Sequence, residues 1–445
     1  MLDDVLARWA DDPRLVHTEV QPARTAHTGT LRSPLDPEVA ERLPHTELWA
    51  HQVAALDLVA AGRSVVVATG TASGKSVTFQ VPTAETTRTG GTALWLFPTK
   101  ALAQDQLTSL TAWRLPWVRA GAYDGDASPE ERAFLRSNAN VLLTNPDMLH
   151  YGILPQHRRW ADFLGRLSLV VVDELHVLRG VFGTHTAQVL RRLRRLVVAH
   201  GGHEPQFVMA SATIGDPAGL ASDLCGLDVE AVTDDGAPLG PRTVALWDPS
   251  AGDPMANASA PGAAARIAAD LVADGQRTLV FCRSRRSTEL VASDLRRLTG
   301  EPTEGGTIRS YRSGYLPEER REIEADLFEG RLRAVVATSA LELGVDIGGL
   351  DAVVLCGFPG TVASFRQQLG RAGRSQQQSL AVLVAGDDQL DRWMVRHPEQ
   401  LFGRPVEASV VNNRNLDVVL PHLGCAAHEL PLRHQDDDLW PDTAA

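Results

Sequence analysis

Two successive series of short apolar runs alternate with helical stretches, and they constrain this chain to an α/β fold. The first series is SVVVAT (64–69), TALWLF (92–97), NVLLT (140–144), LSLVVVD (167–173) and QFVMAS (206–211). The second is RTLVFC (277–282), GTIRSY (306–311), LRAVVAT (332–338), LDAVVLC (350–356) and LAVLVA (380–385). Continuous apolar runs of this length, separated by helices, indicate mostly parallel sheets flanked by helices on both faces.

A segment rich in Pro, Gly, Ala and Asp, residues 233–263, separates the two series and contains one convincing strand, TVALWD (243–248). A chain of 445 residues is also too long for one ordinary core. We therefore expect a first domain over 46–232 and a second over 233–402. A polar N-terminal extension with a short helix near Val5–Trp9 covers 1–45, and 403–445 begins a C-terminal accessory region.

Composition excludes several classes of protein. No apolar run reaches the roughly 18 residues of a membrane span, and the acidic N-terminus lacks the pattern of a secretory signal. The four cysteines are far apart and form no Cys-x-x-Cys pair, so no zinc is expected in this chain. Cys282 and Cys356 lie in apolar runs, which predicts buried free thiols. A cytoplasmic location is expected.

The net charge of −12 argues against a protein that coats nucleic acid by overall charge, so nucleic-acid binding requires a local groove. Almost every basic residue is arginine. The two lysines of the chain are Lys75 and Lys100, and both lie in candidate functional loops.

A phosphate loop follows the first apolar run. The strand SVVVAT leads into Gly70-Thr71-Ala72-Ser73-Gly74-Lys75-Ser76 and then into a helical stretch. Backbone N–H groups of such a turn cradle phosphate oxygens, the lysine approaches the β- and γ-phosphates, and the serine hydroxyl can hold Mg²⁺. Thr69 stands where the full pattern has glycine. A Gly-Lys-Ser turn without a ligand is the alternative.

The run VVVDELH (170–176) ends in two adjacent acids. A carboxylate at the end of a core strand lies at the sheet edge where ligands bind in open α/β folds. Asp173 is expected to hold Mg²⁺ and Glu174 to activate the attacking water. A solvated acid pair is the alternative, which a phosphate loop in the same domain disfavours.

These residues resemble the superfamily-two helicases of the DExH type. The further matches, in the order of that family, are LWAHQ (48–52), PTK (98–100), TNPD (144–147), SAT (211–213), VFCRSRRSTE (280–289), ATSALELGVDIG (337–348) and QQLGRAGR (367–374). The resemblance implies two tandem RecA-like domains with an ATP cleft between them.

The resemblance also assigns roles to individual residues. Gln52 would read the adenine edge, and Asp346 would contact the ribose or the arginines, with a loop-capping aspartate as the alternative. Arg371 and Arg374 would bind the γ-phosphate, for which their planar, always charged groups suit them. The residues expected to couple hydrolysis to movement are His176, Ser211, Thr213 and Gln367. A neutral core histidine remains the alternative for His176.

The nucleic-acid path implied by the family runs over loops of both domains. The residues expected along it are Thr99, Lys100, Thr144, Arg283, Ser284, Thr338 and Ser339. Small hydroxyls and backbone amides suit phosphate contacts without sequence readout. Each of these residues alone is more often an ordinary loop residue.

A narrower likeness lies in ATGTASGKS, the DELH box and SYRSGYLPEERREIE (310–324), which resemble the bacterial YprA/SftH-type DNA helicases of mitomycin-damage repair. That group implies 3′→5′ movement on single-stranded or partly duplex DNA, with repair proteins as possible partners. Its C-terminal cysteine-rich domain has no match within these residues. An RNA-directed motor and an ATP-switched clamp that does not move remain open alternatives.

Overall fold

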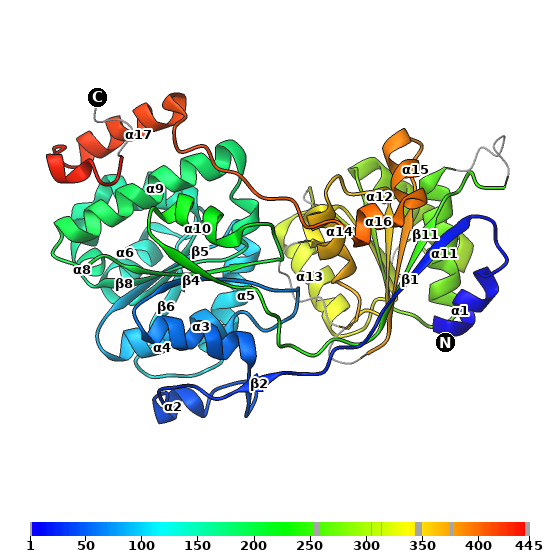
Figure 1. Ribbon diagram of the computed structural model, residues 1–445, viewed down its shortest axis with the longest axis horizontal. Coiled ribbons are helices and arrows are strands. Elements are labelled where there is room, and N and C mark those ends of the chain that lie inside the picture. Colours follow the sequence, from blue (N-terminus) through cyan, green and yellow to red (C-terminus); the bar gives the residue numbers. More distant parts are fainter. Residues whose placement is uncertain are drawn as a thin grey trace. The chain divides into compact units, whose positions relative to one another are not determined.

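The computed structural model describes residues 2–252, 259–303, 305–312, 314–342, 349–373 and 377–440, which form two compact units (Figure 1). The first unit contains His27–Thr69, Ser73–Gly236 and the residues from Ala408 to 440. The second contains the residues up to Ala26, Gly70–Ala72 and Ala237–Glu407. Each unit is built on one seven-stranded sheet.

The sheet of the first unit is parallel throughout. Its strands, in order across the sheet, are β10 (Val229–Val232), β4 (Ser64–Ala68), β9 (Gln206–Ser211), β8 (Leu167–Val172), β5 (Thr92–Leu96), β7 (Val141–Thr144) and β6 (Ala120–Ala122). The five predicted strands are confirmed as the central five. The short edge strands β10 and β6 were not predicted, because neither carries a long apolar run.

Helices cover both faces of this sheet. Figure 1 shows α3 (Ala50–Ala60) and α4 (Val77–Arg88) on one face, and α9 (Gly180–Ala199) and α10 (Pro217–Cys225) on the other. The remaining elements are α2 (Pro37–Ala40), α5 (Lys100–Thr111), α6 (Pro129–Asn138), α7 (Pro146–Met148), α8 (Ala161–Gly165), α17 (Leu416–Glu429), the pair β2 (Thr28–Gly29) and β3 (Leu48–Trp49), and the short helices η1 (Leu149–Ile153), η2 (Leu154–Trp160), η3 (Leu175–Val177) and η5 (His434–Asp436). Strands β4, β5 and β7 are fully buried, as their continuous apolar sequences require.

The sheet of the second unit is parallel except at one edge. Its strands, in order, are β1 (Leu15–Gln21), β11 (Arg242–Trp247), β16 (Ser379–Val384), β15 (Ala352–Cys356), β12 (Thr278–Cys282), β14 (Ala334–Ala337) and β13 (Ile308–Tyr311). The helices are α1 (Leu2–Trp9), α11 (Ala260–Ala273), α12 (Arg285–Thr299), α13 (Pro317–Phe328), α14 (Val362–Leu369), α15 (Gln389–Arg396), α16 (Pro398–Phe402) and η4 (Ser339–Leu341). The expected α/β class with two mostly parallel sheets is confirmed.

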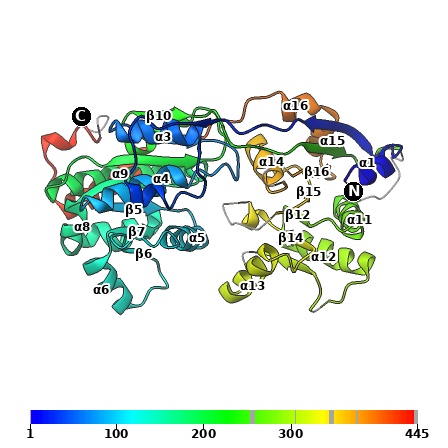
Figure 2. The same cartoon turned by 90° about the horizontal axis from the view of Figure 1, so that it is seen from below.

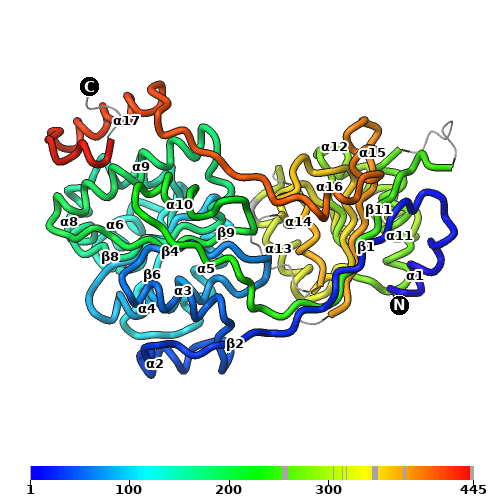
Figure 3. The backbone as a smooth tube through the Cα atoms, in the orientation of Figure 1, coloured from blue at the N-terminus to red at the C-terminus, as the bar shows by residue number. Residues whose placement is uncertain are grey.

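The two ends of the chain join the unit formed by the opposite half of the sequence, a path that the tube in Figure 3 traces. β1, from the N-terminal end, pairs antiparallel with β11 in the second unit. α17, from the C-terminal end, packs on α9 in the first unit. The N-terminal extension is thus divided between the units after Ala26, and its strand β1 was not predicted.

Two further observations concern the described residues only. No helix among them is long and apolar enough to cross a membrane. All four cysteines are free thiols, and three of them, Cys225, Cys282 and Cys356, are buried.

Candidate functional site

Three neighbouring strands of the first unit lead to residues that the sequence predicts to hydrolyse ATP or to couple hydrolysis to movement. β4, β9 and β8 are adjacent and parallel, so their carboxyl ends meet at one sheet edge. β4 leads into the phosphate loop, β9 ends at Ser211, and β8 is followed by Asp173 and Glu174. In the ladder, Ala68 of β4 lies opposite Ser211 of β9. One edge therefore collects three segments that are far apart in sequence, at the place where open α/β sheets bind ligands.

The phosphate loop is held by its own side chains. The Lys75 ammonium donates to the carbonyl oxygen of Thr69 at 3.1 Å, and the hydroxyls of Thr69 and Ser73 lie 2.7 Å apart. Gly74 has φ +69°, a left-handed backbone that favours glycine. α4 begins at Val77, directly after Ser76, so its N-terminal N–H groups point toward the loop. This is an anion-binding arrangement.

The acid pair lies beside the lysine of the loop. Glu174 has φ +51°, and its backbone N–H donates to an Asp173 carboxylate oxygen at 2.8 Å. Burial and the adjacent Glu174 carboxylate raise the pKa of Asp173 to about 7, while the nearby Lys75 lowers it. The Glu174 carboxylate also lies 3.5 Å from Nδ1 of His176. Desolvated carboxylates of this kind gain most from a bound cation.

The residues at this edge fit a magnesium–nucleotide. The Ser211 hydroxyl is fully buried and has no hydrogen-bond partner among the described residues. The Ser76 hydroxyl and the Asp173 carboxylate provide oxygen ligands, which Mg²⁺ prefers. Thr213, two residues after the end of β9, is exposed. The described residues contain no group of three or more His, Cys, Asp or Glu that could hold a metal alone.

Gln52 lies at the start of α3 and is buried. Its amide oxygen accepts from the backbone N–H of Trp49 at 3.0 Å, and its amide nitrogen donates to the Gly74 carbonyl at 2.9 Å. A Cβ at Gly74 would come within 2.9 Å of the Gln52 side chain. Gln52 therefore binds the phosphate loop directly. One amide hydrogen and one oxygen lone pair remain for a ligand such as adenine.

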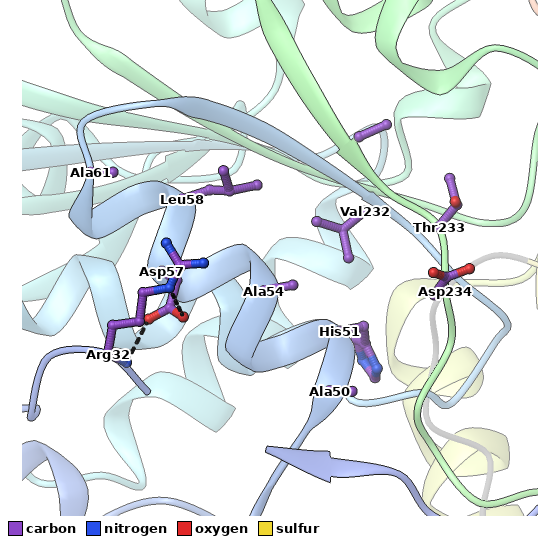
Figure 4. Close-up of a pocket in the computed structure, with 11 residues that line it drawn as sticks. Arg32, Ala50, His51, Ala54, Asp57, Leu58, Ala61, Val232, Thr233 and Asp234 are labelled. Atoms are coloured by element: carbon purple, nitrogen blue, oxygen red, sulfur yellow. Dashed lines mark hydrogen bonds and ion pairs between the residues drawn. The ribbon is translucent and has the colours of Figure 1, made fainter. Parts of the chain in front are cut away.

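A pocket of about 510 Å³ lies along α3, and none of the phosphate-loop residues lines it. Figure 4 shows Arg32 and Asp57 on one side of it and His51, Thr233 and Asp234 on the other. The backbone N–H of Arg32 donates to Asp57 at 2.9 Å. The pocket is thus separate from the phosphate loop, although the same helix lines it.

The predicted nucleic-acid residues of the first unit differ in exposure. Thr99 and Lys100 follow β5 and are exposed, with Thr99 capping α5 and Lys100 2.8 Å from the Asp126 carboxylate. Thr144, in contrast, is buried and donates to the Tyr123 carbonyl at 2.6 Å. Of these three, Thr99 and Lys100 are accessible to a ligand.

The corresponding residues of the second unit follow β12 and β14. Ser284 caps α12 and Thr338 caps η4, where Ser339 is exposed. The Arg283 guanidinium is paired with the carboxylates of Asp388 and Asp391 and donates to the Phe358 carbonyl at 2.8 Å. Arg283 is therefore largely neutralised within its own unit.

Gln367 is buried in α14, and its amide nitrogen has no hydrogen-bond partner among the described residues. Arg371 is half-buried, and its guanidinium donates to the Glu342 carbonyl. Asp346 and Arg374 lie outside the residues that the structure describes.

His51, for which the sequence predicted no role, lies against the phosphate loop. Its Nε2 lies 2.9 Å from the Ser73 carbonyl, and it is buried. The signal available in the sequence was its position directly before Gln52.

Two helicase family models match the chain. The DEAD/DEAH box helicase model matches residues 49–219, and the helicase conserved C-terminal domain model matches residues 263–376. Together they cover most of both units.

Several relatives align along nearly the whole chain. The chain is 41% identical over 429 residues to the ATP-dependent helicase YprA of Bacillus subtilis, covering 94% of this chain and 57% of YprA. It is 39% identical over 444 residues to the ATP-dependent helicase HRQ1 of Saccharomyces cerevisiae, covering 95% of this chain and 41% of HRQ1. The chain thus spans about half the length of these relatives.

Solved structures of two helicases are also similar to this chain. The DUF1998 helicase MrfA bound to DNA and AMPPNP superposes with a TM-score of 0.92 at 39% identity, covering 98% of this chain and 62% of that one. The Mycobacterium smegmatis helicase Lhr bound to ssDNA and AMP-PNP has a TM-score of 0.72 at 27% identity, covering 89% of this chain and 55% of that one. The chain belongs to the superfamily-two helicases, with tandem RecA-like domains of the YprA type.

Proposed function

We propose that this chain is the motor of an ATP-dependent DNA helicase or translocase that moves 3′→5′ along single-stranded DNA. The observation that carries the proposal is the meeting of Lys75, Ser211 and the Asp173-Glu174 pair at one edge of a parallel sheet. A phosphate loop alone indicates nucleotide binding, whereas a positioned carboxylate beside it supports hydrolysis.

The proposed division of labour follows from the geometry. Lys75 places its ammonium against the β- and γ-phosphates, and the N–H groups at the start of α4 bind phosphate oxygens. Ser76 and Asp173 would hold Mg²⁺, which neutralises charge on the β- and γ-phosphates when bound. Glu174 takes the proton of the attacking water. Arg371 and Arg374 are the proposed arginine ligands of the γ-phosphate.

DNA is proposed as the track because two structurally similar helicases have been solved bound to it. MrfA was solved bound to DNA and Lhr bound to ssDNA, each with an ATP analogue. The exposed residues Thr99, Lys100, Ser284 and Ser339 are proposed contacts with its phosphates. Thr338, next to Ser339 in sequence, is also a proposed phosphate contact. Thr144 and Arg283 are weaker candidates because their polar groups are already bonded within the protein. We also propose that the chain acts in DNA repair in the cytoplasm.

The decisive test of the track compares ATP hydrolysis in the presence of DNA and RNA strands of identical sequence. We expect DNA to stimulate hydrolysis and RNA to do so much less, and stimulation by RNA alone would overturn the choice of DNA. Duplexes with a 3′ or a 5′ single-stranded tail then test direction, and unwinding of the 5′-tailed duplex alone would contradict the 3′→5′ assignment. Hydrolysis without displacement of a strand-bound block would identify a clamp.

A further inference from the structure

The start of α3 is bonded to both chain segments that pass between the two units near it. One segment enters the first unit at His27, and the other leaves it after Gly236. The backbone N–H of His27 donates to the Gly236 carbonyl at 2.9 Å, and the His27 carbonyl accepts from the Ala50 N–H at 2.7 Å. Within the second unit, Arg24 and Leu239 continue the pairing through two backbone hydrogen bonds.

His51 connects this crossing to the phosphate loop. Its Nε2 lies 2.9 Å from the Ser73 carbonyl oxygen, and its Nδ1 lies 3.2 Å from the Gly236 backbone nitrogen. A carbonyl can only accept and a backbone N–H can only donate, so Nε2 carries the hydrogen and Nδ1 the lone pair. Both ring nitrogens are thereby used, one toward each segment, and Nδ1 also lies 3.8 Å from the Asp235 carboxylate, next to Gly236.

Two glycines mark the tight fit at either end of this connection. A Cβ at Gly236 would lie 2.8 Å from the His27 carbonyl oxygen and 2.9 Å from the Ala50 nitrogen. A Cβ at Gly74, next to Ser73, would lie 2.5 Å from the Trp49 ring. The backbone at both ends of the Ser73–His51–Gly236 connection is therefore closely packed against residues around the start of α3, which leaves little free space for either end to shift.

We propose that His51 is a positioning residue that transmits the state of the phosphate loop to the segment through which the chain leaves the first unit. This rests on the proposed function, because the state in question is nucleotide bound or released. His51 touches neither phosphate nor DNA in this proposal. By holding Ser73 and Gly236 together, His51 couples ATP hydrolysis to movement along DNA.

The chain permits a test in which each bond is removed separately. Asparagine places its amide oxygen near the position of Nδ1 and can still accept from Gly236, so His51→Asn removes the bond to Ser73. Glutamine places its amide nitrogen near the position of Nε2 and can still donate to Ser73, so His51→Gln removes the bond to Gly236. His203→Asn and His203→Gln are matched controls, because His203 is an exposed histidine of the same unit.

The first readout is strand displacement per ATP hydrolysed on tailed DNA, with thermal melting to establish folding. We expect both His51 variants to lose at least about fivefold in this ratio, the lower end of typical coupling effects, and both controls to keep it. A purely structural histidine would lower hydrolysis and displacement together. An unchanged ratio in either His51 variant overturns the proposal.

A second readout needs no turnover. Hydrogen exchange over residues 233–240 is compared with and without AMP-PNP in the unaltered chain and in the two variants. We expect the analogue to change exchange there by at least about fivefold in the unaltered chain, and the change to disappear in both variants. Absence of the change in the unaltered chain overturns the connection even if ATP is hydrolysed. If the analogue changes hydrogen exchange in a His51-dependent way but the chain does not hydrolyse ATP, the proposed function is refuted. The connection from Ser73 through His51 to Gly236 would then still be supported.

Discussion

The two ends of the chain are attached to their units by different kinds of interaction. The N-terminal segment, residues 2–26, joins the second unit by a strand ladder and apolar packing. The C-terminal segment, residues 408–440, joins the first unit largely through buried charged and polar side chains of α9. Both attachments link residues more than 200 positions apart, so the difference lies in the chemistry of the contact.

At the N-terminal end, β1 pairs with β11 over the register Leu15↔Trp247 to Gln21↔Arg242. Leu2, Val5 and Trp9 of α1 are buried in the apolar cluster of the second unit. Burial of apolar area contributes roughly 25 cal/mol per Å² and involves no titratable group. This attachment is therefore expected to change little with pH.

At the C-terminal end, Arg192 of α9 pairs with Glu429 of α17, and their side chains are only 1% and 2% exposed. Arg195 binds the Asp436 carboxylate at 2.9 Å and the carbonyls of Ala426, Leu430 and Pro431. The Trp440 indole donates to the Gln188 amide oxygen at 2.7 Å. Buried charges are costly unless every partner is present, so this attachment is sensitive to the loss of one group.

The largest effect is expected from removing one buried charge. Arg192→Leu leaves Glu429 buried without its partner and should lower the free energy of unfolding by about 3–5 kcal/mol. Adding Glu429→Leu should recover part of that loss, because no charge is then buried without a partner, while the bonds from Arg192 to the rings of His150 and His422 stay lost. Denaturant titration of the single and double variants checks this, and a double variant as unstable as the single would contradict it.

A smaller effect is expected from acid. Burial and the neighbouring Arg192 lower the pKa of His422 to about 3, from 6.5. The unfolded chain therefore takes up this proton more readily, and stability falls as pH drops from about 6.5 toward 3. Between pH 7.5 and pH 5 the loss is about 2 kcal/mol for this one group.

Hydrogen exchange at pH 5 and pH 7.5, corrected for intrinsic rates, locates that effect. We expect loss of protection in α17 and unchanged protection in β1, which has no comparable buried histidine. Equal loss of protection in both elements would show that the two attachments do not differ as described.

The smallest effect is expected at the N-terminal end. Trp9→Phe keeps most of the apolar contact but removes the indole N–H that donates to Asp270 at 3.2 Å. We expect a cost of about 1 kcal/mol, with the same value at pH 5 and pH 7.5. Thermal melting at both pH values measures it, and a cost that changes strongly with pH would remove the contrast between the two ends.

The features that depend on the local sequence pattern could be predicted from the sequence. The phosphate loop and the Asp173-Glu174 pair follow continuous apolar strands, so their place at a sheet edge could be inferred before the structure was known. The confirmed α/β class rests on the same signal. The resemblance to the helicase family then identified the remaining motifs by their order along the chain.

The sequence did not reveal contacts that depend on long-range packing. The run RRLRR, residues 191–195, has the composition of an exposed basic helix face, yet all four arginines are buried. Arg191, Arg192 and Arg195 bond carbonyls or carboxylates of the C-terminal segment. Arg194 instead bonds Glu204 and two carbonyls at the end of α10. β1 alternates between half-buried and exposed positions and lacks an apolar run. The bonds of His51 to Ser73 and Gly236 join residues 22 and 185 positions away.

The central claim, an ATP-driven motor, rests on the residues at the carboxyl ends of β4, β8 and β9 in the first unit, whose helices α4 and α5 are labelled in Figure 2. The most direct test measures DNA-stimulated ATP hydrolysis by the unaltered chain, Lys75→Ala and Glu174→Gln, with melting curves for all three. We predict that both variants fold but lose at least about a hundredfold in turnover, and that Glu174→Gln still binds nucleotide. Turnover retained in both variants would contradict the account.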